Sequence, residues 1–239
     1  MDREYIQRVK TKPTLADFVE MTLSVFIMAL GVIITVRSLQ GISPVSSLTY
    51  VLSQIADLSL GTMTFIVYFA FVLVQCAVYR DRGMTVRVFS QLPYTLLYSV
   101  CMDVLDYALE PLGAETLIGQ WGLVILGCLL TSLAIAMEAD ANVSMLPDDG
   151  LMLAVHRATR IPLGRSIIVV NIVSIAAAFA LSLGVLGGLY GVGLGTIFMA
   201  VAQGLVVKAI TPLFRRVRKK GHLEDRPIAG NPFFIPISH

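Results

Sequence analysis

The chain consists largely of long apolar segments separated by short polar ones. About 20 consecutive apolar residues form a helix long enough to cross the roughly 30 Å hydrocarbon core of a bilayer. Residues 58–79 and 116–137 reach this length without a charged side chain. Residues 166–207 are also uncharged, are too long for one crossing and contain several glycines between 184 and 195, so they predict two helices joined by a tight turn. The six predicted transmembrane helices are therefore 16–36, 58–79, 88–109, 116–137 and two within 166–207.

Two shorter helices are predicted between these spans, and each begins at a proline. Proline is favoured in the first turn of a helix because the N–H that it lacks has no helical partner there. The predicted short helices, 44–57 and 147–160, are too short to cross a bilayer, and they lie 103 residues apart. The same shift places Pro44, Leu48, Leu60 and Gly61 on Pro147, Leu151, Leu163 and Gly164. This spacing indicates an internal repeat.

The repeat predicts the overall architecture. The first copy begins at a capping-box pattern, Thr14 to Asp17, which marks the start of a helix. Each copy contains three spans with a short helix between the first and the second, and an odd number of spans places the copies in opposite orientations across the membrane. The predicted fold is an all-α polytopic membrane protein of two inverted three-helix repeats. Its predicted divisions are a basic leader at 1–13, the repeats at 14–110 and 111–214, and a basic, disordered tail at 215–239.

Composition excludes a soluble globular domain and indicates an orientation. Of the 239 residues, 56% are hydrophobic and 14% are charged, against about 25% charged in a typical soluble domain, and the mean hydropathy is +0.79. With the N-terminus in the cytoplasm, 17 of the 18 Lys and Arg residues lie on the cytoplasmic side and only Arg37 lies outside. Both termini are therefore expected in the cytoplasm. The expected partner of the basic residues is the anionic lipid surface, and no nucleic-acid partner is expected.

The sequence lacks the common patterns of catalytic and metal-binding chemistry. It contains no Ser/His/Asp or Cys/His constellation, no Walker loop and no dinucleotide-binding loop. Cys76, Cys101 and Cys128 fall in three different predicted spans, where cysteine behaves as a small apolar side chain. We therefore expect no enzymatic activity, no disulfide, no metal and no cofactor.

Two acidic residues within the apolar helices are candidates for function. Ionisable side chains at such depth are usually paired or functional. Glu138 lies at the cytoplasmic end of its predicted span. Asp103 lies several residues deep, and two alternatives are open for it: a structural contact with Arg37, the only basic residue on that side, or a role in binding a solute or cation.

The two short helices indicate where a solute would bind. If both dip into the membrane, their N-termini direct the positive ends of the helix dipoles toward one central site. The alternative is that both lie on the membrane surface, where Asp148 and Asp149 are ordinary N-terminal charges. The residues predicted to form the central site are Ser43, Pro44, Ser46, Ser47, Glu138, Pro147, Asp149 and Gly150.

Several local motifs resemble those of the YczE/YitT-type bacterial membrane proteins. The motifs are GISPVSSLTYVLS at 41–53, LSLGT at 58–62, MLPDDGL at 145–151 and GLGT at 193–196, with Glu138 and Asn142 before the third. The resemblance covers most of residues 16–213 and implies a six-span protein of the bacterial inner membrane. It adds Gln91, Asp103 and Asn142 to the predicted solute site.

Two functions are open on this basis. The inverted repeat and the acidic residues in apolar helices favour a secondary transporter or permease for a small polar solute. The modest length, the glycine-rich packing surface and the scarcity of charge within the spans favour a non-transporting membrane partner, such as a substrate-capture subunit or an assembly factor. Both are compatible with a homo-oligomer or with a complex of different membrane proteins.

Overall fold

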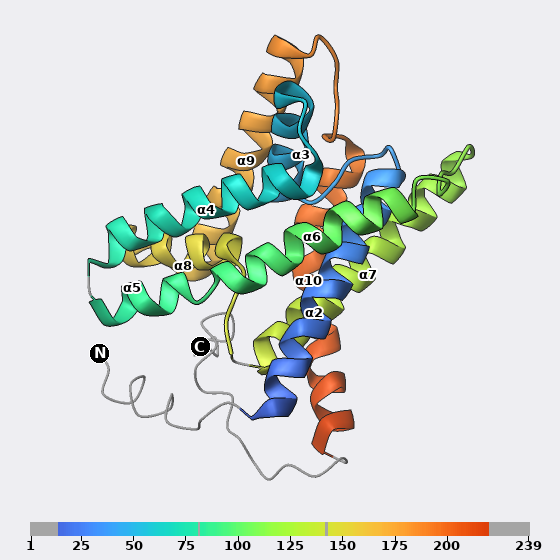
Figure 1. Ribbon diagram of the computed structural model, residues 1–239. Helices are drawn as coiled ribbons and strands as arrows, with labels where there is room; N and C mark the ends of the chain where they lie inside the picture. Colours follow the sequence, from blue (N-terminus) through green and yellow to red (C-terminus); the bar gives the residue numbers. More distant parts are fainter. Residues whose placement is uncertain (1–13, 81, 142, 220–239) are drawn as a thin grey trace.

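The computed structural model describes residues 14–219 except 81 and 142 (Figure 1). The regular structure of this described part is entirely helical and includes no strand. Its helices are α2 (Leu15–Arg37), α3 (Pro44–Ala56), α4 (Leu60–Tyr79), α5 (Arg82–Phe89), α6 (Leu92–Ala108), α7 (Leu117–Ala141), α8 (Pro147–Thr159), α9 (Leu163–Val185) and α10 (Leu194–Lys219). The predicted leader at 1–13 and most of the predicted tail lie outside the described residues.

The helix ends follow local sequence signals. The N–H and Oγ1 of Thr14 donate to Asp17 Oδ2 at 2.7 and 2.8 Å, which confirms the capping box before α2. As predicted, α3 and α8 each begin at a proline. Residues 186–193 separate α9 from α10 and include Gly187 and Gly191 at φ values of 70° and 68°. This confirms the predicted turn, because glycine adopts positive φ without a steric penalty from Cβ.

The spacing of 103 residues is reproduced in the helix boundaries. Adding 103 to the bounds of α3, 44 and 56, gives 147 and 159, which are the bounds of α8. The same shift carries Leu60, the first residue of α4, onto Leu163, the first residue of α9. It also carries the left-handed C-cap of α3, Asp57 at φ 52°, onto that of α8, Arg160 at φ 58°. The corresponding helices of the two predicted repeats, which we call the two repeats below, are therefore α2 with α7, α3 with α8, α4 with α9 and α6 with α10.

Among the described residues, five helices are long and apolar enough to cross a membrane: α2, α4, α7, α9 and most of α10. The protein is thus an integral, multi-pass membrane protein. The remaining predicted span, 88–109, is divided between α5 and α6 in the structure, and α6 has 17 residues. The break falls just before Pro93, which cannot donate the N–H that continues a helical ladder. α6 also carries Asp103 and Asp106, and it is shorter than each of the five helices named above.

The helices pack in two groups of four, which we call the first and the second group. The first group is α2, α6, α7 and α10: α2 packs on α7 and α6, and α7 packs on α10. The second group is α3, α4, α8 and α9: α3 packs on α9 and α4, and α8 packs on α4 and α9. Each short helix thus packs on a long helix of the other repeat, α8 on α4 and α3 on α9, as Figure 1 shows for α3. The groups meet where α4 contacts α6 and where α3 contacts α10.

The helices α2 and α7 cross with their backbones in contact. A Cβ placed on Gly31 would lie 2.8 Å from Thr131 Cγ2 and 3.1 Å from the Gly127 carbonyl oxygen. A Cβ placed on Gly127 would lie 2.7 Å from the Gly31 carbonyl oxygen and would also meet Thr35 Cγ2. Glycine at both positions is what allows this approach, as small residues do where helices associate in membranes. The two repeats are joined by this crossing.

We expect Gly127→Ala to destabilise the protein, because the added methyl group meets backbone atoms of α2 that cannot move aside as a flexible side chain can. Overpacking of this kind costs about 1–3 kcal/mol. The detergent-purified variant should therefore unfold at a lower temperature than the parent protein. Gly122→Ala on the same helix is the matched control, since nothing lies within 4 Å of a Cβ there. Equal unfolding temperatures for the two variants would contradict the close crossing.

Candidate functional site

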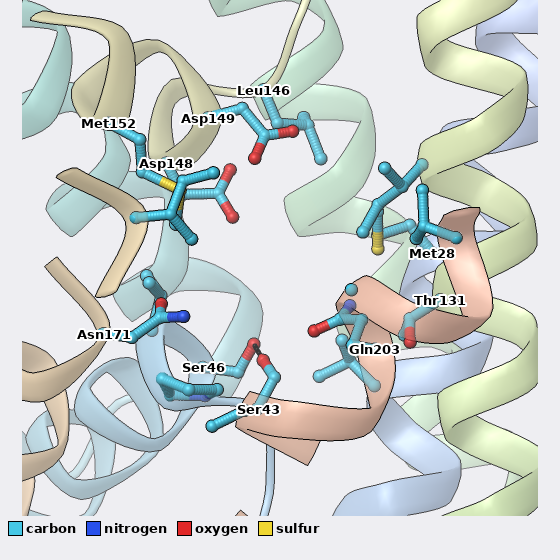
Figure 2. Close-up of a pocket in the computed structure, with 18 of the residues that line it drawn as sticks. Met28, Ser43, Ser46, Thr131, Leu146, Asp148, Asp149, Met152, Asn171 and Gln203 are labelled. Carbon is cyan, nitrogen blue, oxygen red and sulfur yellow. Dashed lines mark hydrogen bonds between the residues drawn. The ribbon is translucent and has the colours of Figure 1, made fainter. Parts of the chain in front are cut away.

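A cavity of about 640 Å³ lies between the first and the second group of helices. Every described helix except α5 contributes to its lining, so both repeats take part. Small-molecule sites commonly have volumes of about 300–1,000 Å³. Figure 2 shows polar side chains around the cavity: Asp148 and Asp149 in the upper part of the view, Ser43 and Ser46 in the lower part, Asn171 at the left, and Gln203 and Thr131 at the right. Most other lining side chains are apolar or aromatic.

One wall of the cavity is the beginning of α3. Ser43, Pro44, Val45 and Ser46 line the cavity, and the Ser43 hydroxyl donates to Ser46 Oγ at 2.8 Å. No side chain caps the first turn of this helix. The N–H groups of a first turn carry the positive end of the helix dipole. This wall therefore favours hydrogen-bond acceptors.

Ser47 lies behind this wall and fixes its position. Its hydroxyl lies within hydrogen-bond distance of the Ser43 and Gly191 carbonyl oxygens, at 3.0 and 2.8 Å. The Ile42 N–H also donates to the Gly191 carbonyl oxygen, at 3.2 Å. These contacts join the beginning of α3 to the turn between α9 and α10. Ser47 thus links the two repeats beside the cavity without lining it.

The beginning of α8 forms a second wall of the cavity. Leu146, Asp148, Asp149 and Met152 line the cavity. The backbone N–H of Leu146, the N-cap residue, donates to Glu138 Oε1 at 2.7 Å. Glu138 is 6% exposed and does not belong to the lining. Its carboxylate satisfies a backbone donor that the turn into α8 would otherwise leave buried and unpaired.

Two buried glutamines hold the same helix start from a different direction. Gln75 of α4 and Gln91, the N-cap residue of α6, exchange side-chain hydrogen bonds of 3.3 and 3.0 Å. Gln75 Nε2 also donates to the Pro147 carbonyl oxygen at 3.1 Å. Gly150 packs on the Gln75 amide, where an added Cβ would lie 2.8 Å from Cδ. This network fixes α4, α6 and α8 relative to one another.

The acidic residues of the cavity form no ion pair in the part of the chain that the structure describes. The hydroxyl of Tyr68 lies against the Asp148 carboxyl group. Asp148 Oδ1, however, is buried and has no hydrogen-bond partner among the described residues. Burying an unpaired carboxylate oxygen away from water is unfavourable. The arrangement therefore favours a ligand that places a positive charge in the cavity beside this carboxyl group.

Asp103 lies away from the cavity and caps α4. Its Oδ1 accepts a hydrogen bond from the Gly61 N–H at 2.7 Å, and its Oδ2 accepts one from the Ser59 hydroxyl at 2.8 Å. Of the two alternatives left open for Asp103, the contact with Arg37 is not formed, because Arg37 pairs with Asp106 at 2.7 Å, about one turn along α6. The N-terminus of α4 already satisfies both carboxylate oxygens of Asp103.

The structure brings part of the predicted solute site together. The residues of that site that line the cavity are Ser43, Pro44, Ser46 and Asp149. The residues that position these walls from behind are Ser47, Gln91, Glu138, Pro147 and Gly150. Asp103 lies elsewhere, and Asn142 falls outside the described residues.

Besides the charged Asp148 and Lys208, which were also outside the predicted site, five uncharged polar or aromatic lining residues were not candidates on sequence grounds: Tyr68, Tyr98, Thr131, Asn171 and Gln203. The sequence could have indicated Asn171 and Gln203 as candidates, because each is an amide side chain within an otherwise apolar span. The sequence pattern does not indicate Tyr68, Tyr98 or Thr131 in this way. Tyrosine and threonine are ordinary residues of packed membrane helices, and only the tertiary arrangement shows that these three face a shared volume.

Several membrane-crossing helices around a central cavity define this chain as a polytopic, all-helical membrane protein. Residues 15–212 match the family described as "Family of unknown function (DUF6198)", and the chain belongs to that family. No curated protein and no solved structure matches the chain. The resemblance to the YczE/YitT-type proteins stays a prediction, since the family match does not test it.

We expect Glu138→Ala to be clearly destabilising and Glu138→Gln to be milder. Alanine leaves the buried Leu146 N–H without a partner, which costs about 1–3 kcal/mol. Glutamine keeps an oxygen at the position of Oε1 and can still accept this hydrogen bond. Thermal unfolding of both variants in detergent measures the difference. If glutamine destabilises as much as alanine, the role assigned to Glu138 as the acceptor of this N–H is wrong.

Proposed function

We propose that the protein is a secondary transporter or permease for a small polar solute, which binds in the cavity between the two groups of helices. One observation carries the proposal. The proline-led starts of α3 and α8, one from each repeat, line the same volume. Transporters built from inverted repeats place their sites at helix ends of this kind, near the middle of the bilayer.

In this proposal the two repeats have opposite orientations. The first repeat crosses the membrane with α2, α4 and α6, and the second crosses it with α7, α9 and α10. The 17 residues of α6 form a helix about 26 Å long, close to the roughly 27 Å hydrocarbon thickness of thinner bilayers. The short helices α3 and α8 enter from opposite sides. The excess of basic residues on one side supports cytoplasmic termini, and the resemblance to the YczE/YitT-type proteins supports the bacterial inner membrane.

The packing supports a mechanism in which the second group moves against the first. Rocking of one helical unit against another around a fixed site is a common route to alternating access. Asp103 and Ser99 of α6 bond to the start of α4 across the groups, and two further sets of hydrogen bonds lie beside the starts of the two short helices. The Gln75 and Gln91 amides pair near the start of α8. The Gly195 N–H donates to the Gln40 carbonyl oxygen, at 2.8 Å, near the start of α3. Breaking one set while keeping the other would open the cavity toward one side.

A second candidate function is a solute-capture subunit that delivers its ligand to a membrane partner. One observation favours it: 22% of the residues in the apolar windows of α9 and α10 are buried, compared with 56% in α2. These two helices therefore offer long apolar faces to lipid, to a second copy or to another membrane protein. Such a subunit would bind the solute but would not transport it alone.

Uptake into proteoliposomes that contain only this chain tests the proposal. The vesicles are incubated with a mixed library of small polar metabolites, washed and analysed by mass spectrometry for solutes enriched over protein-free vesicles. We expect at least one enriched solute. We also expect Asp149→Asn to lower its uptake about tenfold or more, since a hydrogen bond to a charged group contributes about 1.5–3 kcal/mol and about 1.4 kcal/mol corresponds to tenfold.

Asp57→Asn is the matched control, because it removes the same charge at an exposed helix C-cap outside the cavity and asparagine tolerates the left-handed conformation there. Uptake should be unchanged in this variant. Equal uptake by the parent protein and Asp149→Asn would exclude the cavity as the binding site. Solute binding in detergent with no uptake into vesicles would favour the capture subunit.

A further inference from the structure

The side chains that line the cavity carry more negative than positive charge. Asp148 and Asp149 are acidic and Lys208 is basic, so two negative charges and one positive charge give a formal balance of −1. Lys208 is exposed and pairs with neither aspartate in the described part of the chain. A cationic ligand is the partner that this imbalance favours.

The dipole of α8 does not turn this end of the cavity into an anion site. The Asp148 carboxyl group lies in the first turn of α8, beside the backbone N–H groups of that turn. The helix start is therefore occupied by a carboxylate of its own, as is usual for an acidic residue in a first turn. Asp148 keeps Oδ1 unpartnered, and the Asp149 carboxyl group also faces the cavity in Figure 2. Both carboxylates thus remain available to a ligand.

Two tyrosine rings stand beside these carboxylates. Tyr68 and Tyr98 line the cavity and stack with ring centroids 5.9 Å apart and an interplanar angle of 18°. Both are almost completely buried, and the Tyr68 hydroxyl contacts the Asp148 carboxyl group. Tyrosine rings attract ammonium groups through their negative faces, most strongly away from water. Tyr68 is also stacked on Phe71, with ring centroids 5.8 Å apart, so Tyr98 is the ring of the pair that can present a face to an organic ammonium ion beside the carboxylates.

The rest of the lining suits the apolar part of such a ligand. Met28, Val32, Ile135, Met152 and Ile167 contribute aliphatic surface from four helices, α2, α7, α8 and α9. Methionine adapts to ligands of different shape because its side chain is flexible and polarisable. The beginning of α3 supplies hydrogen-bond donors on another wall, which would donate to a neutral oxygen of the ligand.

We infer that the solute of this cavity is an amphipathic organic cation, in which an ammonium group bound by Asp148 and Asp149 against the ring of Tyr98 is attached to an apolar body. This inference rests on the proposed function of the same cavity. The competing class is an organic anion, which Lys208 and the beginning of α3 would favour.

Thermal stabilisation of the full-length, detergent-purified protein by probes of matched size tests the inference. The probes are phenethylamine and benzyltrimethylammonium as cations, 3-phenylpropionate as the anion and 2-phenylethanol as the neutral analogue. We expect the unfolding temperature to rise with either cation and to stay unchanged with the other two. Asp148→Asn and Asp149→Asn should each weaken the apparent affinity for the cations about tenfold or more, whereas Asp57→Asn should leave it unchanged.

Two conservative variants separate recognition from folding. Asp148→Glu keeps the charge and should retain part of the affinity that Asp148→Asn loses. Tyr98→Phe keeps the ring and should bind the cations normally, whereas Tyr98→Leu should bind them more weakly. Stabilisation by the anion or the alcohol instead of the cations would overturn the inference and leave the transport proposal standing. Failure of all four probes would also overturn it, and uptake of the metabolite library would then decide the transport proposal separately.

Discussion

The arrangement depends on the crossing of α2 and α7, where two helices from different repeats bring their backbones together at Gly31 and Gly127. Helices in a membrane gain no hydrophobic energy from leaving lipid, so close packing and hydrogen bonds must hold them together. Thr35 and Thr131 complete the contact on either side. Because α2 and α7 precede the two short helices, the crossing determines where both proline-led segments begin, and hence where the cavity lies.

A second constraint is that backbone groups at membrane depth need partners. The chain meets it differently at the two short helices. Near α8, side chains supply the partners: Glu138 accepts from the Leu146 N–H, and Gln75 donates to the Pro147 carbonyl oxygen. Near α3, backbone groups supply the partners: the Ile42 N–H donates to the Gly191 carbonyl oxygen, and the Gly195 N–H donates to the Gln40 carbonyl oxygen. At the start of α8, Asp148 Oδ1 is left without a partner among the described residues.

The features that the sequence predicted correctly are features of local structure. The offset of 103 residues reproduces the bounds of α3 and α8, and the capping box and the glycine-rich turn are present, because proline, glycine and capping residues act through their own backbone. The features that the sequence did not predict depend on tertiary contacts between helices. Asp103 and Asp106 lie three positions apart on one helix face, and their spacing does not reveal which of them faces the start of α4 and which faces Arg37. The tyrosine pair and the glutamine pair likewise depend on contacts between helices distant in the chain or joined by a turn.

The central claim is that the two repeats are inverted and enclose one site between them. Asp57 and Arg160 test it most directly, because they are equivalent C-cap residues 103 positions apart and both are exposed. Single cysteines at these positions, in a chain whose three native cysteines are replaced by alanine, are labelled with a membrane-impermeant maleimide in intact cells and in inverted vesicles. The account predicts that Asp57→Cys reacts only from outside and Arg160→Cys only from the cytoplasmic side. Reaction of both from the same face would contradict it.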